Sequence, residues 1–177
     1  MTGVARAEPA GCDFDILVRE HQAMVFSLAY YFLHDRALAE EVAQEVFLSL
    51  HRNLAAVESP EHARFWLRQA AARRAIDETR RRKRRPQVAL EEAPEPAAGI
   101  AGRDPMLGAM LRRLIAALPQ DARMVMVLRY QEDLDPSEIA EILAMPLATV
   151  KSHLHRSLAV LREKLARRGV EGPHGLA

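Results

Sequence analysis

Apolar residues recur every three or four positions through most of this chain, and this spacing limits the possible fold more than any other feature of the sequence. The repeat runs through about residues 13–33, 36–54, 60–85, 105–118 and 147–168, and no segment shows the strict alternation of a half-buried strand. Alanine, leucine and arginine are abundant, and these residues lose little side-chain freedom in a helix. The sequence therefore predicts an all-α fold.

Capping residues indicate where several of these helices begin. The dipeptides Ser-Pro at 59–60 and Asp-Pro at 104–105 join a capping side chain to a proline that suits the first helical turn. The strongest start is Asp135, because Glu138 follows it by three residues, the spacing of a reciprocal capping pair. We expect a short helix over 137–143 after this cap.

The composition changes abruptly at residues 86–104, where three prolines and two glycines interrupt the periodic pattern. We expect a flexible linker here, which divides the chain into two small helical domains at 13–85 and 105–168. Residues 1–12 are expected to form a flexible arm, and residues 169–177 a disordered tail.

The net charge of +1 conceals two basic segments. Residues 73–85 carry eight Lys and Arg against two acidic residues, and residues 150–168 carry six against one. One such run alone is as often a solvated helix face. Two separate basic helical segments favour a polyanionic partner that the chain contacts twice, such as nucleic acid.

The segment 136–165 has the pattern of a helix-turn-helix: a short capped helix, a tight turn at 144–146 and a longer basic helix. Ile142 and Val150 would help to pack the two helices together. The polar residues that the second helix would present to a DNA major groove are Thr149, Lys151, Ser152, His155 and Arg156. The alternative is an ordinary helical hairpin with a solvated charged face.

Two further segments carry surface patterns. WLRQAAARRAIDETRRRKRR, from Trp66 to Arg85, crowds arginines into a cationic stripe that suits a phosphate backbone, although such a stripe could also bind RNA, acidic lipid or an acidic protein. AEEVAQEVFLSL, residues 39–50, is expected to bury one face and to leave its other residues on a single exposed face. That exposed face consists of Glu40, Glu41, Gln44, Glu45, Leu48 and His51. Periodicity alone makes it a plain solvated face.

In this order and spacing, the three segments resemble the sigma-70 superfamily, and specifically the small extracytoplasmic-function (ECF) sigma factors. The resemblance implies a three- to four-helix bundle called region 2 at 14–85 and a helix-turn-helix domain called region 4 at 105–168. It also implies the function of an RNA polymerase sigma factor, which binds core polymerase and directs promoter-specific transcription initiation.

The same resemblance implies a role for each segment. ALAEEVAQEVFLSL is similar to the stretch that binds a coiled coil of the polymerase β′ subunit, which makes Glu41, Gln44, Glu45 and Leu48 core-polymerase contacts. The helix at 65–85 is similar to the one that binds and opens the −10 promoter element, and the loop at 55–61 would hold a flipped base. The implied −10 contacts are Trp66, Arg73, Arg74, Arg80, Arg81 and Arg84.

EIAEILAMPLATVKSHLHRSL is similar to the helix-turn-helix that reads the −35 element, with Thr149, Lys151, Ser152, His155 and Arg156 on the DNA. The implied partners are core RNA polymerase through its β′ coiled coil and β flap, promoter DNA, and an anti-sigma factor. The chain departs from the usual family pattern at four places. Arg73 stands where an asparagine is usual, Ala144 where a glycine is usual and His153 where an arginine is common, and the usual basic-Ala-basic run reads Arg156-Ser157-Leu158. At Ala144 we expect a turn that avoids a left-handed backbone.

Several other classes of protein are not predicted. The sequence has no Gly-rich phosphate loop, nucleophile elbow or zinc-ligand spacing, so we expect no enzyme, metal site or cofactor. Its single cysteine and the absence of a long apolar run favour a cytoplasmic protein without membrane insertion. The main alternative is a dimeric helix-turn-helix regulator that acts without replacing a sigma factor.

Overall fold

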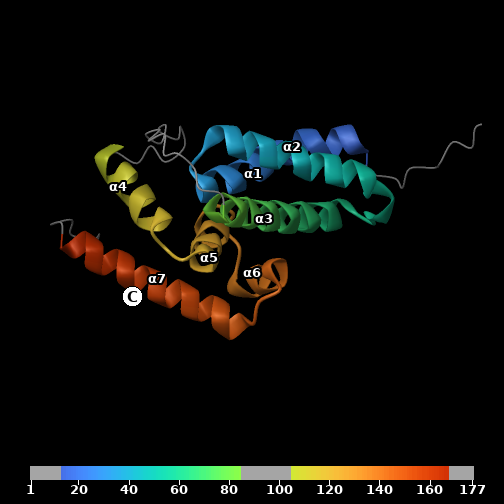
Figure 1. Cartoon of the computed structure of the whole chain (residues 1–177). Coiled ribbons are helices and arrows are strands. Elements are labelled where there is room, and N and C mark those ends of the chain that lie inside the picture. Colours follow the sequence, from blue (N-terminus) through green and yellow to red (C-terminus); the bar gives the residue numbers. More distant parts are fainter. Residues whose placement is uncertain (1–12, 85–104, 168–177) are drawn as a thin grey trace, which may run out of the picture. The chain divides into compact units, whose positions relative to one another are not determined.

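The computed structural model describes residues 13–84 and 105–167, which belong to two compact units. All regular elements in these two ranges are helices, which confirms the predicted all-α class (Figure 1). The first unit contains α1 to α3 and the second contains α4 to α7. The predicted arm at 1–12, linker at 86–104 and tail at 169–177 lie outside the described residues.

The first unit is a bundle of three long helices, α1 (Phe14–Leu33), α2 (Arg36–Arg52) and α3 (Pro60–Arg84), each packed on the other two. A short 3-10 helix, η1 (Leu54–Ala56), follows α2. The predicted cap is present at α3, where the Ser59 hydroxyl accepts from the His62 backbone N–H at 3.1 Å. A cap that was not predicted begins α2, where the Asp35 carboxylate accepts from the Leu38 backbone N–H at 3.0 Å. The fully buried large side chains of this core are Leu17, Val25, Leu28, Phe32, Val46, Leu50 and Leu67.

Small residues form the buried face of α3. Ala63, Ala71, Ala72 and Ala75 are completely buried beside Leu67. The apolar spacing had placed Trp66 and Leu67 toward the core, on a side that also carries Phe65, Ala70, Ala71 and Ile76. Leu67 and Ala71 are buried as expected, whereas the prediction was wrong for Phe65, Trp66, Ala70 and Ile76, which are only half-buried. A face of alanines lets α3 approach its two neighbours closely, so the larger residues lie at its edges.

The second unit contains α4 (Pro105–Ala116), α5 (Gln120–Tyr130), α6 (Pro136–Leu143) and α7 (Leu147–Ala166). One apolar cluster joins α4, α5 and α7 through Leu114, Leu118, Ala122, Met126 and Leu161. Pro119 separates α4 from α5 and cannot donate a backbone hydrogen bond, which fits its place at the N-cap of α5.

The helix-turn-helix is formed by α6 and α7, with Ile139, Ile142 and Val150 buried. The predicted reciprocal cap is present: Asp135 accepts from the backbone N–H of Glu138 at 3.0 Å, and Glu138 accepts from that of Asp135 at 2.8 Å. The expectation for Ala144 was wrong. This residue has φ 50° and ψ 47°, a left-handed conformation, and its N–H closes the end of α6.

Candidate partner and nucleic-acid interfaces

An apolar groove of about 840 Å³ runs between α1 and α2. Its floor and walls are mostly large apolar side chains: Phe14, Val18, Phe26, Phe47 and Leu48. Two of the four predicted polymerase contacts, Gln44 and Leu48, line this groove, and Leu48 is 56% exposed. A surface leucine beside an open apolar groove is a feature of sites that bind another protein.

The other two predicted polymerase contacts lie on a different side of α2. Glu45 forms an ion pair with Arg74 of α3 at 3.1 Å, and Glu41 lies 3.9 Å from Arg81 of the same helix. All six residues of the predicted face are exposed or half-buried, as expected, but they do not border a single feature of the bundle. The exposed residues of α2 divide between a groove with α1 and a charged seam with α3.

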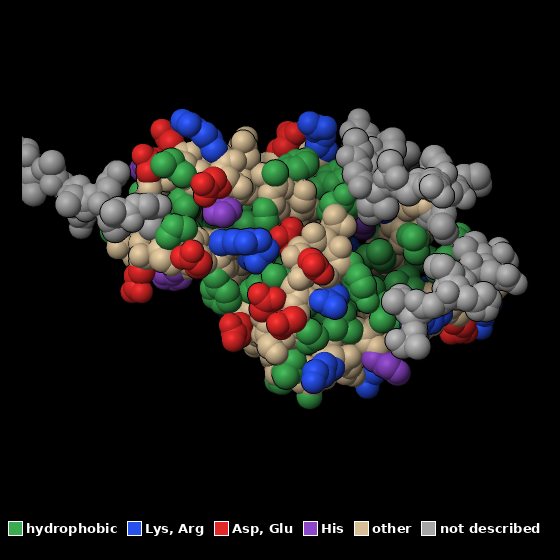
Figure 2. All heavy atoms as spheres, turned by 180° about the vertical axis from the view of Figure 1, so that it is seen from behind, with side chains coloured by type: hydrophobic (Ala, Val, Ile, Leu, Met, Phe, Trp, Pro, Cys, Tyr) green, Lys and Arg blue, Asp and Glu red, His purple; other side chains and the backbone are tan. Residues whose placement is uncertain are grey.

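This charged seam extends along both helices. Arg82 lies 3.4 Å from Asp35, the residue that caps α2, and Glu78 accepts from Arg81 at 2.8 Å. The hydrogen bond and the charge of Glu78 raise the pKa of the Arg81 guanidinium, so this side chain keeps its positive charge. Figure 2 shows, on the face that it draws, Lys and Arg side chains interspersed with Asp and Glu.

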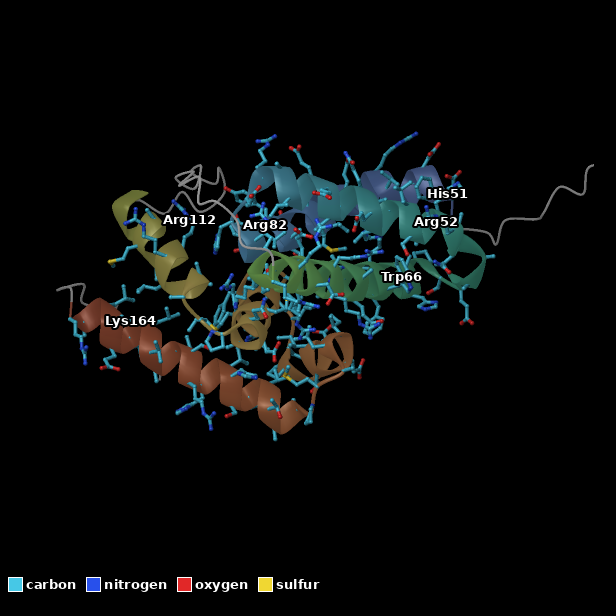
Figure 3. The ribbon with its side chains drawn as sticks, viewed as in Figure 1. His51, Arg52, Trp66, Arg82, Arg112 and Lys164 are labelled. Carbon is cyan, nitrogen blue, oxygen red and sulfur yellow. The ribbon has the colours of Figure 1, made fainter. Side chains whose placement is uncertain are left out.

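The predicted −10 contacts follow almost the whole length of α3. Figure 3 shows Trp66 in the half of the helix near η1 and Arg82 near its opposite end. Trp66, Arg73 and Arg74 line a second groove, of about 280 Å³, between α2 and α3. Arg73, Arg80, Arg81 and Arg84 are exposed, and within the described residues Arg73 and Arg84 have no ion-pair partner. The structure thus brings the tryptophan and two of the arginines together in one groove.

The predicted −35 contacts lie on the first three turns of α7. Lys151, His155 and Arg156 are exposed, while Thr149 and Ser152 are half-buried. Ser157 is 2% exposed, so the polar residue that follows Arg156 faces the core and is unavailable to DNA. His153, the departure from the family pattern, is half-buried.

The groove between α1 and α2 was not predicted from the sequence. Phe14, Val18 and Phe47 belong to the apolar stripes of their helices, which the spacing predicts to be buried, and all three are only half-buried. A signal was present, since both helices carry apolar residues over a wider arc than a three-helix core covers.

Within 13–84 and 105–167, no group of three His, Cys, Asp or Glu side chains is placed to hold a metal ion. No helix in the same two ranges is long and apolar enough to cross a membrane.

Two family profiles match this chain, one on each unit. The profile described as Sigma-70 region 2 matches residues 17–85, which include most of the first bundle. The profile described as Sigma-70, region 4 matches residues 108–161, which include the helix-turn-helix.

Whole-chain relatives agree with these profiles. The chain is 32% identical to the ECF RNA polymerase sigma factor SigE of Mycolicibacterium smegmatis over 96% of its own length and 67% of that protein's. It is 31% identical to the RNA polymerase sigma-H factor of Pseudomonas aeruginosa over 86% of each chain. The sigma factor RpoE from Bartonella quintana, solved in complex with the anti-sigma factor NepR, has a similar fold, with a TM-score of 0.67 at 17% identity over 87% of this chain and 97% of that one.

Proposed function

Because this chain belongs to the sigma-70 family, as an RNA polymerase sigma factor of the ECF group, we propose that its two units divide the contacts with polymerase and promoter DNA between them. The observation that carries the proposal is the presence of both a region 2 and a region 4 match, in that order, in one chain. Sigma factors bind RNA polymerase and promoter DNA.

We assign the groove between α1 and α2 to a helix of the polymerase β′ coiled coil. Gln44 offers an amide at the edge of the groove, and Leu48 is the large apolar side chain most available to an incoming helix. An amphipathic helix laid into an apolar groove buries its own apolar face there, which provides most of the affinity. Glu41 and Glu45 contribute less to this contact in our assignment, because their carboxylates face α3.

We assign α3 to the −10 element. Its exposed arginines would bind phosphates, which gives affinity without sequence information. Trp66 lies in a groove with Arg73 and Arg74, where an aromatic ring can stack on an unpaired base.

The −35 element is assigned to the start of α7. Lys151, His155 and Arg156 are exposed on a helix that the turn at Ala144 and the core contact of Val150 hold in a fixed direction. Such a recognition helix reads base edges through residues near its N-terminus. The β flap of polymerase is the partner we propose for the rest of this unit.

An anti-sigma factor is a further proposed partner. The sigma factor of similar fold from Bartonella quintana was solved with one, and the apolar groove between α1 and α2 is a surface that such a protein could cover. The chain itself supplies no catalytic group in this proposal, and the polymerase carries out the chemistry.

The test is transcription in vitro with purified core polymerase, this protein and fragmented genomic DNA of its source. We expect discrete transcripts that appear only when the protein is added, and mapping their starts would give the promoter sequence. Leu48→Glu should remove these transcripts, because a carboxylate in the apolar groove would lose its hydration without gaining a partner. Ile16→Glu is the matched control, since Ile16 is 46% exposed on α1 and does not line the groove.

The outcome also separates the proposal from the dimeric regulator. If no transcript depends on the protein, and if it binds duplex DNA tightly as a dimer without polymerase, the regulator is the correct function. Equal activity of the Leu48→Glu and Ile16→Glu variants would leave the sigma factor function in place and would remove the groove as the polymerase site.

A further inference from the structure

Three arginines of α3 lie within ion-pair distance of carboxylates of α2 and of its cap. Arg74 pairs with Glu45 at 3.1 Å, and Arg82 with Asp35 at 3.4 Å. Arg81 donates to Glu78 of its own helix at 2.8 Å and has Glu41 as a second carboxylate neighbour at 3.9 Å. These three pairs join two different helices along one seam, so they are set by the packing of the bundle and not by local spacing on one helix.

The paired groups are open to solvent. Arg74 and Arg81 are 51% and 53% exposed, and the side chains of Glu41 and Glu45 are exposed to a similar extent. Exposed pairs of this kind are weak, because water and salt screen them and each long side chain loses freedom. They contribute little to stability, and another charge can replace either partner easily.

We propose that Glu41 and Glu45 act as internal counterions, which lower the affinity of the free protein for DNA by occupying Arg81 and Arg74. The inference rests on the proposed function of α3, because it requires that these arginines bind phosphates. A phosphate that binds Arg74 must compete with the Glu45 carboxylate and then leaves that carboxylate unpaired. A basic partner on the same side of α2 would pair with the carboxylates and release the arginines.

The balance of charge supports this proposal. Without the carboxylates of α2 and of its cap, α3 would present an almost unbroken row of cations in its second half, since residues 73–84 carry seven Lys and Arg and only Asp77 and Glu78 oppose them. Such a row binds any duplex DNA without regard to sequence. A protein that acts only when bound to polymerase gains specificity if carboxylates partly neutralise these basic residues of α3 while the protein is free.

The experiment measures binding of the full chain, without polymerase, to a short fluorescent duplex of arbitrary sequence at several salt concentrations. The test variant is Glu41→Gln with Glu45→Gln. The matched control is Glu20→Gln with Glu40→Gln, which changes the net charge equally at exposed sites that do not pair with α3, because Glu40 pairs with Arg36 of its own helix. A second control, Arg73→Ala with Arg84→Ala, asks whether α3 binds DNA at all.

We expect the test variant to bind about threefold to tenfold more tightly than the original protein, and more tightly than the Glu20/Glu40 control. The plot of log affinity against log salt should become steeper by about 0.9 for each arginine that gains a phosphate. Adding Arg74→Ala and Arg81→Ala to the test variant should abolish both gains.

One result would contradict the counterion role of Glu41 and Glu45, and a different result would contradict DNA binding by α3. Equal tightening and equal salt slopes in the Glu41/Glu45 and Glu20/Glu40 variants would mean that only net charge matters, which overturns the counterion role. If Arg73→Ala with Arg84→Ala leaves the affinity unchanged, α3 does not bind DNA, and the function proposed for that helix is wrong.

Discussion

The backbone conformation of Ala144 could not be predicted from the sequence. The turn between α6 and α7 requires a residue in the left-handed conformation, with φ 50°. An alanine in the sequence gives no sign of this requirement, because alanine usually adopts a negative φ. A non-glycine residue in this conformation is strained by roughly 1–2 kcal/mol. The strain is tolerated because the Ala144 N–H closes the end of α6 and the buried contacts of α6 and α7 fix the turn.

Ala144→Gly should therefore stabilise the second unit. The relief of strain exceeds the extra unfolded-state entropy of glycine, about 0.5–1 kcal/mol, so the net gain in the free energy of unfolding should be up to about 1 kcal/mol. Urea unfolding followed by circular dichroism would detect the change. The control is Ala148→Gly, in the first turn of α7, which should lose about 0.5–1 kcal/mol because that residue is helical. A lower urea midpoint for Ala144→Gly would contradict the argument.

His21 should make the stability of the first unit depend on pH. Burial lowers the pKa of this imidazole below its ordinary value of 6.5, and the positive charges of Arg64 and Arg68 act in the same direction, against the negative charge of Glu20. Its Nε2 atom is buried and has no hydrogen-bond partner among the described residues. Because the unfolded chain takes up the proton more readily, the contribution of neutral His21 is complete above about pH 6.5 and is lost as the pH falls.

The measurement compares the urea midpoint of the original protein with that of His21→Gln between about pH 7.5 and 5.5. The original protein should lose more stability over this range than the variant, whose side chain does not titrate. Parallel curves would assign the pH dependence to other groups.

At the scale of single helices, sequence patterns predicted the ends better than the faces. The starts of α3 and α6 follow the predicted caps Ser59 and Asp135, whose side chains accept hydrogen bonds from nearby backbone N–H groups, and such contacts are local and therefore visible in sequence. The faces depend on which helix packs against which. The exposed residues of α2 were predicted as one surface, and only the positions of α1 and α3 divide them into Leu48 on the groove and Glu45 on the charged seam.

The same reasoning explains α3. Its large apolar residues dominate the hydrophobic pattern of the sequence, yet its buried face consists mainly of alanines. Alanine is only weakly hydrophobic and therefore adds little to such a pattern. The predicted DNA contacts on α3 and α7 remain predictions about function. Their exposure is set by the folded helices, but contact with DNA depends on a partner that the chain does not contain.

The cap of α6 should control how the helix-turn-helix binds DNA. This helix has eight residues, too few to be stable alone. Its first turn therefore depends on the reciprocal side-chain-to-backbone hydrogen bonds between Asp135 and Glu138. Asp135→Ala should cost about 1 kcal/mol of unfolding free energy and weaken promoter binding by the polymerase complex. Asp135→Asn is the control, since asparagine is an equally good N-cap and should restore most of both properties. Equal losses in the two variants would show that charge, and not capping, is what matters at this position.

For the whole molecule, the important property is that each unit has a core of its own. The first is built from α1 to α3 and the second from α4 to α7, and twenty residues of sequence, 85–104, connect them. If one unit binds polymerase and the −10 element while the other binds the −35 element, the second contact occurs within one complex. A connection of this length holds a unit at an effective concentration in the millimolar range, so each contact alone can be weak.

Cutting the connection between the two units should therefore lower transcription. A protease site inserted between residues 95 and 96 should leave transcription nearly unchanged before cleavage, because insertion there interrupts no described helix. After cleavage, transcription from a promoter that needs both elements should fall by about a hundredfold at micromolar protein, since the second unit must now bind from solution.

The matched measurement uses a promoter whose −35 element has been scrambled. Transcription from it should be low and should change little on cleavage, because the second unit no longer contributes through DNA. Raising the concentration of the cleaved protein should restore part of the activity at the intact promoter, as expected when affinity has been lost but neither unit has unfolded. If the cleaved protein is as active as the intact one at the same low concentration, the covalent connection is not the source of cooperation, and the units must be held together by polymerase alone.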